Sequence, residues 1–240
     1  LMQYDEVIER AKRAKDLGAT RVCLGAAWRE VRDSKQFDAV LRIIQGVADL
    51  GVEVCCTLGM LKPHQAKRLK EAGLHSYNHN IDSSETYYKK IITTRTYQDR
   101  LKTLDIVRKE GLGICCGGIL GMGETILDRL EFLLTLCTQD PHPDSVPINR
   151  LSPVPGTPLE NQPQTTVWEL IRVIAIARIV MPKAMVRLSS GRNEMTLEEQ
   201  ALCFFAGVNS IHTGEKLLTV ANPTAEKDEH MFQLLGLKKR

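Results

Sequence analysis

The chain has 240 residues, of which 43% are hydrophobic and 25% are charged, and its formal net charge is +3. This length and apolar content suffice for one sizeable core. Charges of both signs are interspersed, and no apolar run approaches the ~18 residues that span a bilayer. The polar, helix-like start is not typical of a secretory signal. We therefore expect neither nucleic acid nor a membrane as a partner.

Seven cysteines occur in the chain, and an odd number without a secretory signal argues against a disulfide framework. We therefore expect a reducing compartment, either the cytoplasm or, in a eukaryote, the mitochondrial matrix. Free cysteine is among the most buried residue types, so inert packing is the simplest interpretation of any one of them. The seven are Cys23, Cys55, Cys56, Cys115, Cys116, Cys137 and Cys203.

Along the chain, stretches with apolar residues at helical spacing alternate with short apolar runs. A glycine at the end of several helical stretches is a plausible stop signal. The predicted helices span 4–17, 37–50, 63–72, 97–109, 125–137, 167–179 and 197–205. The predicted strands span 20–26, 52–58, 75–80, 113–116, 145–148, 184–189 and 207–211.

Strands that alternate with helices predict parallel βαβ units. The chain begins on a helix and offers seven strands, whereas a closed (β/α)8 barrel of roughly 250 residues has eight. We therefore predict an α/β chain with one TIM-type (β/α)8 barrel domain over 1–240, whose first strand and its loop lie upstream of Leu1. A doubly wound sheet is the alternative, but the glycines of 117–123 lack the G-x-G-x-x-G spacing of its phosphate site.

Three of the cysteines, Cys23, Cys55 and Cys115, each lie in the middle of a different predicted strand. In a barrel, residues that point inward from neighbouring strands can converge on one point. Three soft thiolate ligands held by rigid elements suit zinc or an iron–sulfur cluster. There is no local C-x-x-C pair, so the spacing alone favours inert thiols over a metal site.

Polar residues cluster after the third predicted strand, in the segment "YNHNID". Asn78, Asn80 and Asp82 alternate there, which suits hydrogen bonds to a ribose or a small polar ligand. Turn chemistry explains the same residues equally well. The later segment "GGILGMGE" opens a helix, where glycines allow close backbone approach to a ligand. Arg187 lies between Val186 and Leu188 in a strand, and the simplest explanation of such a buried arginine is an ion pair.

Seven of the ten prolines fall between Pro141 and Pro163. They make a long, stiff connection with one predicted strand inside it. Long loops of compact domains are usually functional, so we expect a role for this segment in binding.

Seven segments stand out in order along nearly the whole chain: "RVCLGAAWREV", "VEVCCTLGML", "YNHNIDSSETYYKKIITTRTYQDRL", "GGILGMGET", "SVPINRLSPVPGTPL", "MVRLSSGR" and "FFAGVNSI". Together they resemble the biotin synthase family, which belongs to the radical S-adenosylmethionine (SAM) superfamily. The resemblance implies a (β/α)8 barrel with a C-terminal biotin- and thiamin-synthesis-associated portion over roughly 150–240.

The resemblance also implies the chemistry. A [4Fe–4S] cluster cleaves SAM reductively to a 5′-deoxyadenosyl radical, which abstracts hydrogen from C9 and C6 of dethiobiotin. Sulfur is inserted between these two carbons to form biotin, with a [2Fe–2S] cluster as the proposed donor. The cofactors carry the difficult chemistry, and the protein supplies position and excludes water. An electron donor such as flavodoxin or ferredoxin and a homodimer are implied as well.

Residue by residue, the resemblance implies three sets of contacts. The ligands of the [2Fe–2S] cluster correspond to Cys23, Cys55, Cys115 and Arg187. The SAM contacts correspond to Asn80 and Asp82 at the ribose, Arg100 at the methionyl carboxylate and Ile119 at the adenine. The dethiobiotin contacts correspond to Asn78 and Asn149, the second of which lies in the proline-rich segment. Cys56 and Cys116 directly follow ligands, so on a strand they face the other way and pack.

One departure from the family is large. The C-x-x-x-C-x-x-C loop that holds the [4Fe–4S] cluster does not occur in the sequence. It belongs after the first strand, so the chain resembles an N-terminally incomplete member, and we expect the 240 residues alone not to cleave SAM. The alternatives are a truncated or inactive homologue, another radical SAM barrel with a single cluster, and a barrel aldolase or isomerase without redox chemistry.

Overall fold

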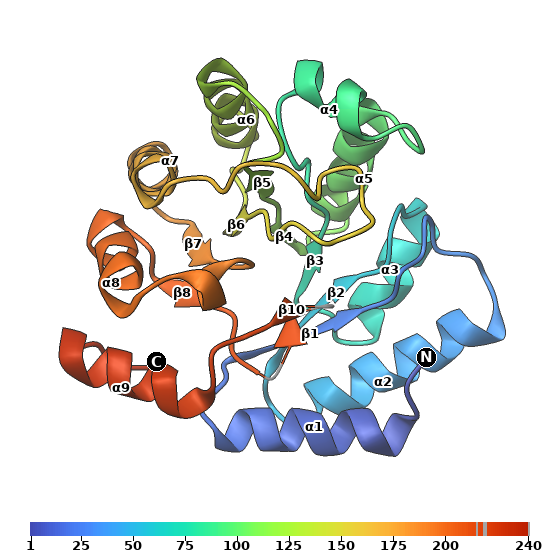
Figure 1. Cartoon of the computed structure of the whole chain (residues 1–240). Helices are drawn as coiled ribbons and strands as arrows, with labels where there is room; N and C mark the ends of the chain where they lie inside the picture. The colour runs from blue at the N-terminus through green and yellow to red at the C-terminus, as the bar shows by residue number, and fades with distance from the viewer. Residues whose placement is uncertain (215, 218–219, 240) are drawn as a thin grey trace. The chain divides into compact units, whose positions relative to one another are not determined.

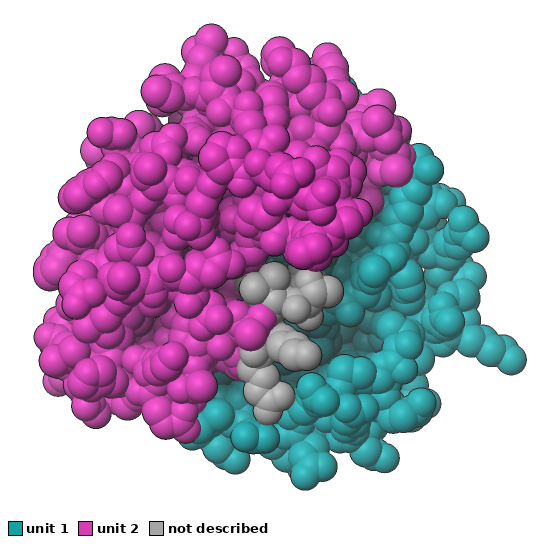
Figure 2. Space-filling view, viewed as in Figure 1, with its two compact units in different colours: residues 1–79, 98–115, 239–240 teal, residues 80–97, 116–238 magenta. Residues whose placement is uncertain are grey.

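The computed structural model describes residues 1–214, 216–217 and 220–239. The chain forms two compact units, coloured separately in Figure 2. Unit 1 comprises Leu1–His79, Gln98–Cys115 and Lys239–Arg240, and unit 2 comprises Asn80–Tyr97 and Cys116–Lys238. Helices alternate with strands along the chain, as predicted (Figure 1).

Unit 1 is built on four parallel strands in the order β1-β2-β3-β4. Cys23 lies opposite Cys55, Cys55 opposite Ser76, and Asn78 opposite Cys115. The strands are β1 (Arg21–Gly25), β2 (Glu53–Thr57), β3 (Ser76–Asn78) and β4 (Gly113–Cys115). The helices are α1 (Tyr4–Asp16), α2 (Lys35–Ala48), α3 (Pro63–Glu71) and α5 (Tyr97–Lys109), the last of which begins at the final residue of a unit 2 segment.

Glycines end the helices of unit 1 where the sequence predicts it. Gly51 after α2 and Gly73 after α3 have φ of 76° and 92°, a backbone conformation that favours glycine. Each turn leads directly into the next strand. Apolar side chains of α2, β2 and α3 make the core, with Ile44, Val54 and Leu69 fully buried.

Unit 2 is built on β6, with β5 and β7 parallel to it and β8 parallel to β7. The strands are β5 (Gly118–Leu120), β6 (Ser145–Arg150), β7 (Met185–Leu188) and β8 (Ser210–Ile211), with a separate antiparallel pair, β9 (Lys216–Leu217) and β10 (Val220–Ala221). The helices are α4 (Glu85–Ile91), α6 (Ile126–Cys137), α7 (Val167–Val180), α8 (Leu197–Ala206) and α9 (Ala225–Leu235), with a 3-10 turn η1 (Arg192–Glu194).

Capping boxes start three helices of unit 2, because a threonine and an acid three residues later satisfy each other's backbone N–H groups. Thr125 with Asp128 starts α6, and Thr166 with Glu169 starts α7. Thr196 with Glu199 does the same for α8. Each cap defines the residue at which its helix begins.

All seven predicted strands are present, and their parallel pairing confirms the predicted α/β class. β3 is shorter than predicted, so Asn80 and Asp82 lie beyond the strand. The elements that were not predicted are α4, β5, α9, the short pair of β9 and β10, and the 3-10 turn η1. No helix in the described part of the chain is long and apolar enough to traverse a bilayer.

Candidate functional site

Three thiols from three strands of unit 1 meet one another. Contact with the Cys115 thiol, then contact with the Cys23 thiol, and then burial raise the pKa of Cys55 well above its usual range. Cys55 and Cys115 are buried, whereas Cys23 is exposed. Thiols crowded in this way cannot all ionise unless a cation compensates their charge. Thiolates that share a bound metal are the usual solution to this problem.

Among the described residues, no three or more His, Cys, Asp or Glu side chains are grouped so that they could hold a metal ion. Cys55 brings the three thiols together, but their arrangement does not by itself define a metal site.

Arg21 places a buried positive charge beside these thiols. Its Nε and Nη2 atoms lie 2.8 and 2.7 Å from Glu53 Oε2, and its side chain is 6% exposed. Burial lowers the pKa of Arg21, but the hydrogen bond and charge of Glu53, with the nearby Cys55 and Cys115, raise it overall. Nη1 has no hydrogen-bond partner among the described residues. A donor held in this position suits a group that carries negative charge on sulfur.

Asn78, the first predicted dethiobiotin contact, lies beside the Cys115 thiol. Its Nδ2 atom donates to Cys115 Sγ at 3.2 Å and to the Cys115 carbonyl at 3.3 Å, and its Oδ1 atom accepts from Thr57 Oγ1 at 3.0 Å. Asn78 therefore orients the Cys115 thiol. Cys56, which follows Cys55, is fully buried in packing, and this burial raises the pKa of Cys56.

In unit 2, the segment after β3 lies against the glycine-rich stretch. Asn80 Oδ1 accepts from the Gly117 N–H at 3.0 Å, and the Asp82 carbonyl accepts from the Ile119 N–H at 2.9 Å. Asp82 has φ of 66°, which is uncommon outside glycine and is a candidate for functional strain. Three of the four predicted SAM contacts are thereby brought together. The fourth, Arg100, lies on α5 in unit 1.

Glycine is required at the start of this stretch because another backbone approaches it. A Cβ atom on Gly117 would collide with the Pro147 carbonyl oxygen, and one on Gly118 would lie 2.5 Å from the Asp82 carbonyl oxygen. The sequence predicted that this segment opens a helix, but Gly118–Leu120 first pairs with β6 as strand β5, and α6 begins only at Ile126. At these residues the glycines permit close backbone packing in a strand.

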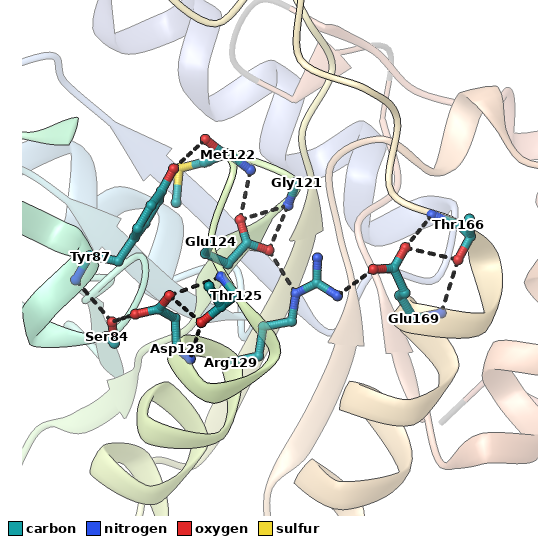
Figure 3. A network of polar contacts seen from close by, with 10 residues as sticks. All are labelled: Ser84, Tyr87, Gly121, Met122, Glu124, Thr125, Asp128, Arg129, Thr166 and Glu169. Carbon is teal, nitrogen blue, oxygen red and sulfur yellow. Dashed lines mark hydrogen bonds and ion pairs between the residues drawn. The ribbon is translucent and has the colours of Figure 1, made fainter. Parts of the chain in front are cut away.

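A polar network that the sequence did not reveal follows β5 (Figure 3). Glu124 accepts hydrogen bonds from the N–H groups of Gly121 and Met122, and it pairs with Arg129. Its only sequence signal is a glutamate directly after a glycine turn, followed five residues later by an arginine. Such a pair lies outside the i, i+4 spacing that predicts contacts on a helix.

Arg187 and Asn149 both lie in unit 2. Arg187 is 5% exposed, and its Nε atom donates to Ser210 Oγ at 2.9 Å. The sequence favoured an ion pair as the explanation of its burial, and among the described residues no carboxylate pairs with it. Asn149 Nδ2 donates to the Gly118 carbonyl at 2.9 Å, and its Oδ1 accepts from the Ser190 N–H at 3.2 Å. Asn149 therefore connects the ends of β5 and β7.

Two family models match the chain. The Radical SAM superfamily model matches residues 1–136, and the Biotin and Thiamin Synthesis associated domain model matches residues 147–238. Biotin synthase of Cytophaga hutchinsonii is 59% identical over 240 residues, which cover 100% of this chain and 71% of that protein. Biotin synthase of Chlamydia abortus is 59% identical, with coverage of 100% and 72%.

Solved structures share the fold at low sequence identity. The crystal structure of methylornithine synthase (PylB) has a TM-score of 0.81 at 18% identity, and the match covers 100% of this chain and 74% of that one. The FeFe-hydrogenase maturase HydG from Carboxydothermus hydrogenoformans has a TM-score of 0.80 at 19% identity, with coverage of 98% and 59%. These likenesses confirm the predicted fold class.

The parallel α/β fold and the superfamily match over residues 1–136 define the class, that of the radical SAM enzymes. Such enzymes use a [4Fe–4S] cluster and SAM. Identity of 59% along the full chain narrows the class further: the chain belongs to the biotin synthase family.

Proposed function

We propose that this chain provides the dethiobiotin-converting core of a biotin synthase, in which sulfur is inserted between C6 and C9 of dethiobiotin. The single observation that carries the proposal is the meeting of Cys23, Cys55 and Cys115 beside the Arg21 guanidinium. A radical SAM barrel with one cluster has no need of a thiol on three separate strands. Inert packing does not explain an arginine whose Nη1 donor is buried without a partner.

The three thiols would hold the [2Fe–2S] cluster, with Arg187 as the fourth ligand. When bound, the cluster would supply sulfur and take up electrons. Cys55 and Cys115 would anchor it from buried strands, Asn78 would orient the Cys115 sulfur, and Arg21 would compensate negative charge. Arg187 is included because of the family resemblance and because no described carboxylate pairs with it. No described residue is assigned to the [4Fe–4S] cluster.

SAM would bind at the glycine-rich stretch of unit 2, with Asn80 and Asp82 at the ribose and Ile119 at the adenine. Their proximity to one another and the strained backbone of Asp82 support this assignment. Arg100 at the methionyl carboxylate is assigned by resemblance. Asn149 would contact dethiobiotin while it connects β5 to β7.

Two partner proposals complete the function. A flavodoxin- or ferredoxin-type donor would deliver electrons, on the resemblance alone. A homodimer is supported by an exposed apolar stripe on α6, made by Ile126, Leu127, Leu130 and Leu134. Sedimentation equilibrium tests the dimer, which requires twice the 26.9 kDa mass of the chain.

The proposal is tested by anaerobic reconstitution of the chain with iron and sulfide. We expect about two iron and two acid-labile sulfide per chain at this site, with visible absorption typical of a [2Fe–2S] cluster. Calorimetry with dethiobiotin on the same sample should show saturable binding. A colourless protein that retains neither iron nor dethiobiotin would contradict the proposal.

A further inference from the structure

The turn after β5 has a tightly defined backbone. Gly121 and Gly123 have φ of 96° and 104°, values that favour glycine. A Cβ atom on Gly121 would collide with Thr165 Oγ1, and one on Gly123 would lie 2.6 Å from Tyr87 Oη. Neighbouring side chains therefore restrict the backbone of this turn and leave no room for a side chain at either glycine.

Glu124 holds the N–H groups of this turn. Its side chain is 1% exposed, and its carboxylate accepts from the Gly121 N–H at 2.9 Å and from the Met122 N–H at 2.8 Å (Figure 3). A carboxylate this deeply buried requires a countercharge. Arg129 provides it, with its Nε atom 2.7 Å from Glu124 Oε1.

Arg129 is itself held by the start of α7. Its Nη1 atom donates to Glu169 Oε1 at 2.8 Å, while Glu169 Oε2 accepts from the N–H and hydroxyl of Thr166 at 3.0 and 2.9 Å. The hydrogen bond from Arg129, followed by that from the Thr166 N–H, lowers the pKa of Glu169 to about 2. The contacts thus run without a break from the N-terminus of α7 to the turn.

The opposite side of the turn is held by α4. The Tyr87 hydroxyl donates to the Met122 carbonyl at 2.6 Å, and the Tyr87 N–H donates to Ser84 Oγ at 3.0 Å. Both backbone polar groups of Met122 are therefore hydrogen-bonded: its N–H donates to Glu124, and its carbonyl accepts from Tyr87. A turn held in this way is organised before any ligand arrives.

We propose that Glu124, Arg129 and Glu169 form a positioning relay that holds this turn in the shape that receives the adenine part of SAM. The inference rests on the proposed function, in which Ile119, on the strand that leads into the turn, contacts the adenine. Without Arg129, the buried carboxylate of Glu124 would lose its countercharge and would be free to turn toward water. The N–H groups of Gly121 and Met122 would then lose their acceptor.

The test is equilibrium binding to the anaerobically reconstituted full chain. Arg129→Met removes the charge and keeps the length of the side chain, and we expect it to weaken SAM binding by about tenfold. Arg129→Lys should restore part of this loss, because it returns a cation to Glu124. Binding of 5′-deoxyadenosine should weaken by the same factor as SAM binding, since the relay acts on the adenosyl part. Dethiobiotin affinity and visible absorption should stay as in the wild type.

Arg172→Met is the matched control, because Arg172 is an exposed arginine on α7 outside the network. The SAM affinity of this variant should equal that of the wild type. If Arg129→Met does not fold, Glu169→Gln replaces it, since Glu169 is 34% exposed, and a loss of about threefold is expected. Unchanged SAM affinity in either variant would overturn the relay. Equal losses of SAM, dethiobiotin and absorption would indicate a general structural role and overturn it as well. A wild-type chain that binds no SAM would overturn the proposed SAM site, and the relay with it.

Discussion

Arg21 lies two residues before Cys23 on β1, so the two side chains share one face of the strand. We expect Arg21→Met to lower the reduction potential of the reconstituted cluster, on the order of tens of millivolts, because a nearby cation favours the more negative reduced state. Glu53→Gln should shift the potential upward, because Glu53 offsets the charge of Arg21.

A redox titration followed by visible absorption measures both shifts. Arg10→Met is the control, because the side chain of Arg10 is 66% exposed on α1. A potential that is the same in wild type and Arg21→Met would show that the guanidinium does not face the cluster.

Asn149 is the residue at which we expect a substitution to affect dethiobiotin most. Asn149→Ala should weaken dethiobiotin binding by about 1–3 kcal/mol, because a polar substrate group loses its partner. Affinity for SAM should change less. Because Asn149 also bonds to the Gly118 carbonyl and the Ser190 N–H, the midpoint of thermal unfolding should fall too. Calorimetry with each ligand measures both affinities. An unchanged dethiobiotin affinity would refute the assignment of Asn149 as a dethiobiotin contact.

At the residue scale, the sequence predicted that Cys23, Cys55 and Cys115 could meet because each lies in the middle of a different predicted strand. Alternation along a strand separates Cys55 from Cys56, but the family resemblance was needed to say which of the two faces the other thiols. The same alternation places Arg21 on the face of Cys23, but it could not predict that Arg21 pairs with Glu53, because that contact depends on the adjacent strand. It also could not predict that Asn78 bonds to Cys115, because their sequence separation gives no register.

At the element scale, the ion pair between α6 and α7 gives stability a defined pH dependence. The pKa of Glu169 is lowered to about 2, mainly by Arg129, whereas an unfolded glutamate has a pKa of about 4.3. The contribution of the Glu169–Arg129 pair to the free energy of unfolding is therefore fully present above about pH 4.3 and is lost as pH falls toward 2. Since Glu169 is 34% exposed, we expect its ion pair with Arg129 to contribute less than about 1 kcal/mol to stability.

The comparison of wild type with Glu169→Gln measures this contribution. Urea unfolding at pH 7 should show the variant to be less stable, and the difference should shrink steadily from pH 4.3 downward. A difference that grows on acidification would show that the carboxylate is not stabilised by Arg129.

The elements that the sequence predicted and those that it missed differ in a physical way. Helices with long apolar faces and a glycine stop, such as α2, were predicted to within two residues at each end. The strand β5 was missed because the close packing that makes Gly117 and Gly118 necessary depends on Pro147 and Asp82, which are distant in the chain. The short polar helix α4 was missed because its stability comes from Ser84 at its cap and from tertiary contacts.

At the scale of the whole molecule, most residues of the two candidate sites belong to different units. The thiols and Arg21 belong to unit 1, and the glycine turn with its relay belongs to unit 2. Arg187 and Arg100, which are assigned by resemblance, each belong to the other unit. Variants of the thiols or of the relay can therefore be controlled by measuring the binding or absorption that belongs to the other site. The family models divide differently, at residues 136 and 147, so they do not mark these units.

The central claim is that three thiols from three strands hold a [2Fe–2S] cluster, and one paired measurement tests it most directly. Wild type, Cys55→Ala and Cys56→Ala are reconstituted anaerobically in parallel, and visible absorption is recorded for each. Cys55→Ala should lose the cluster absorption, because its thiol contacts those of Cys23 and Cys115. Cys56→Ala should keep it nearly intact, because this neighbour faces the other side of β2. Equal absorption in the two variants, whether lost or retained, would contradict the account.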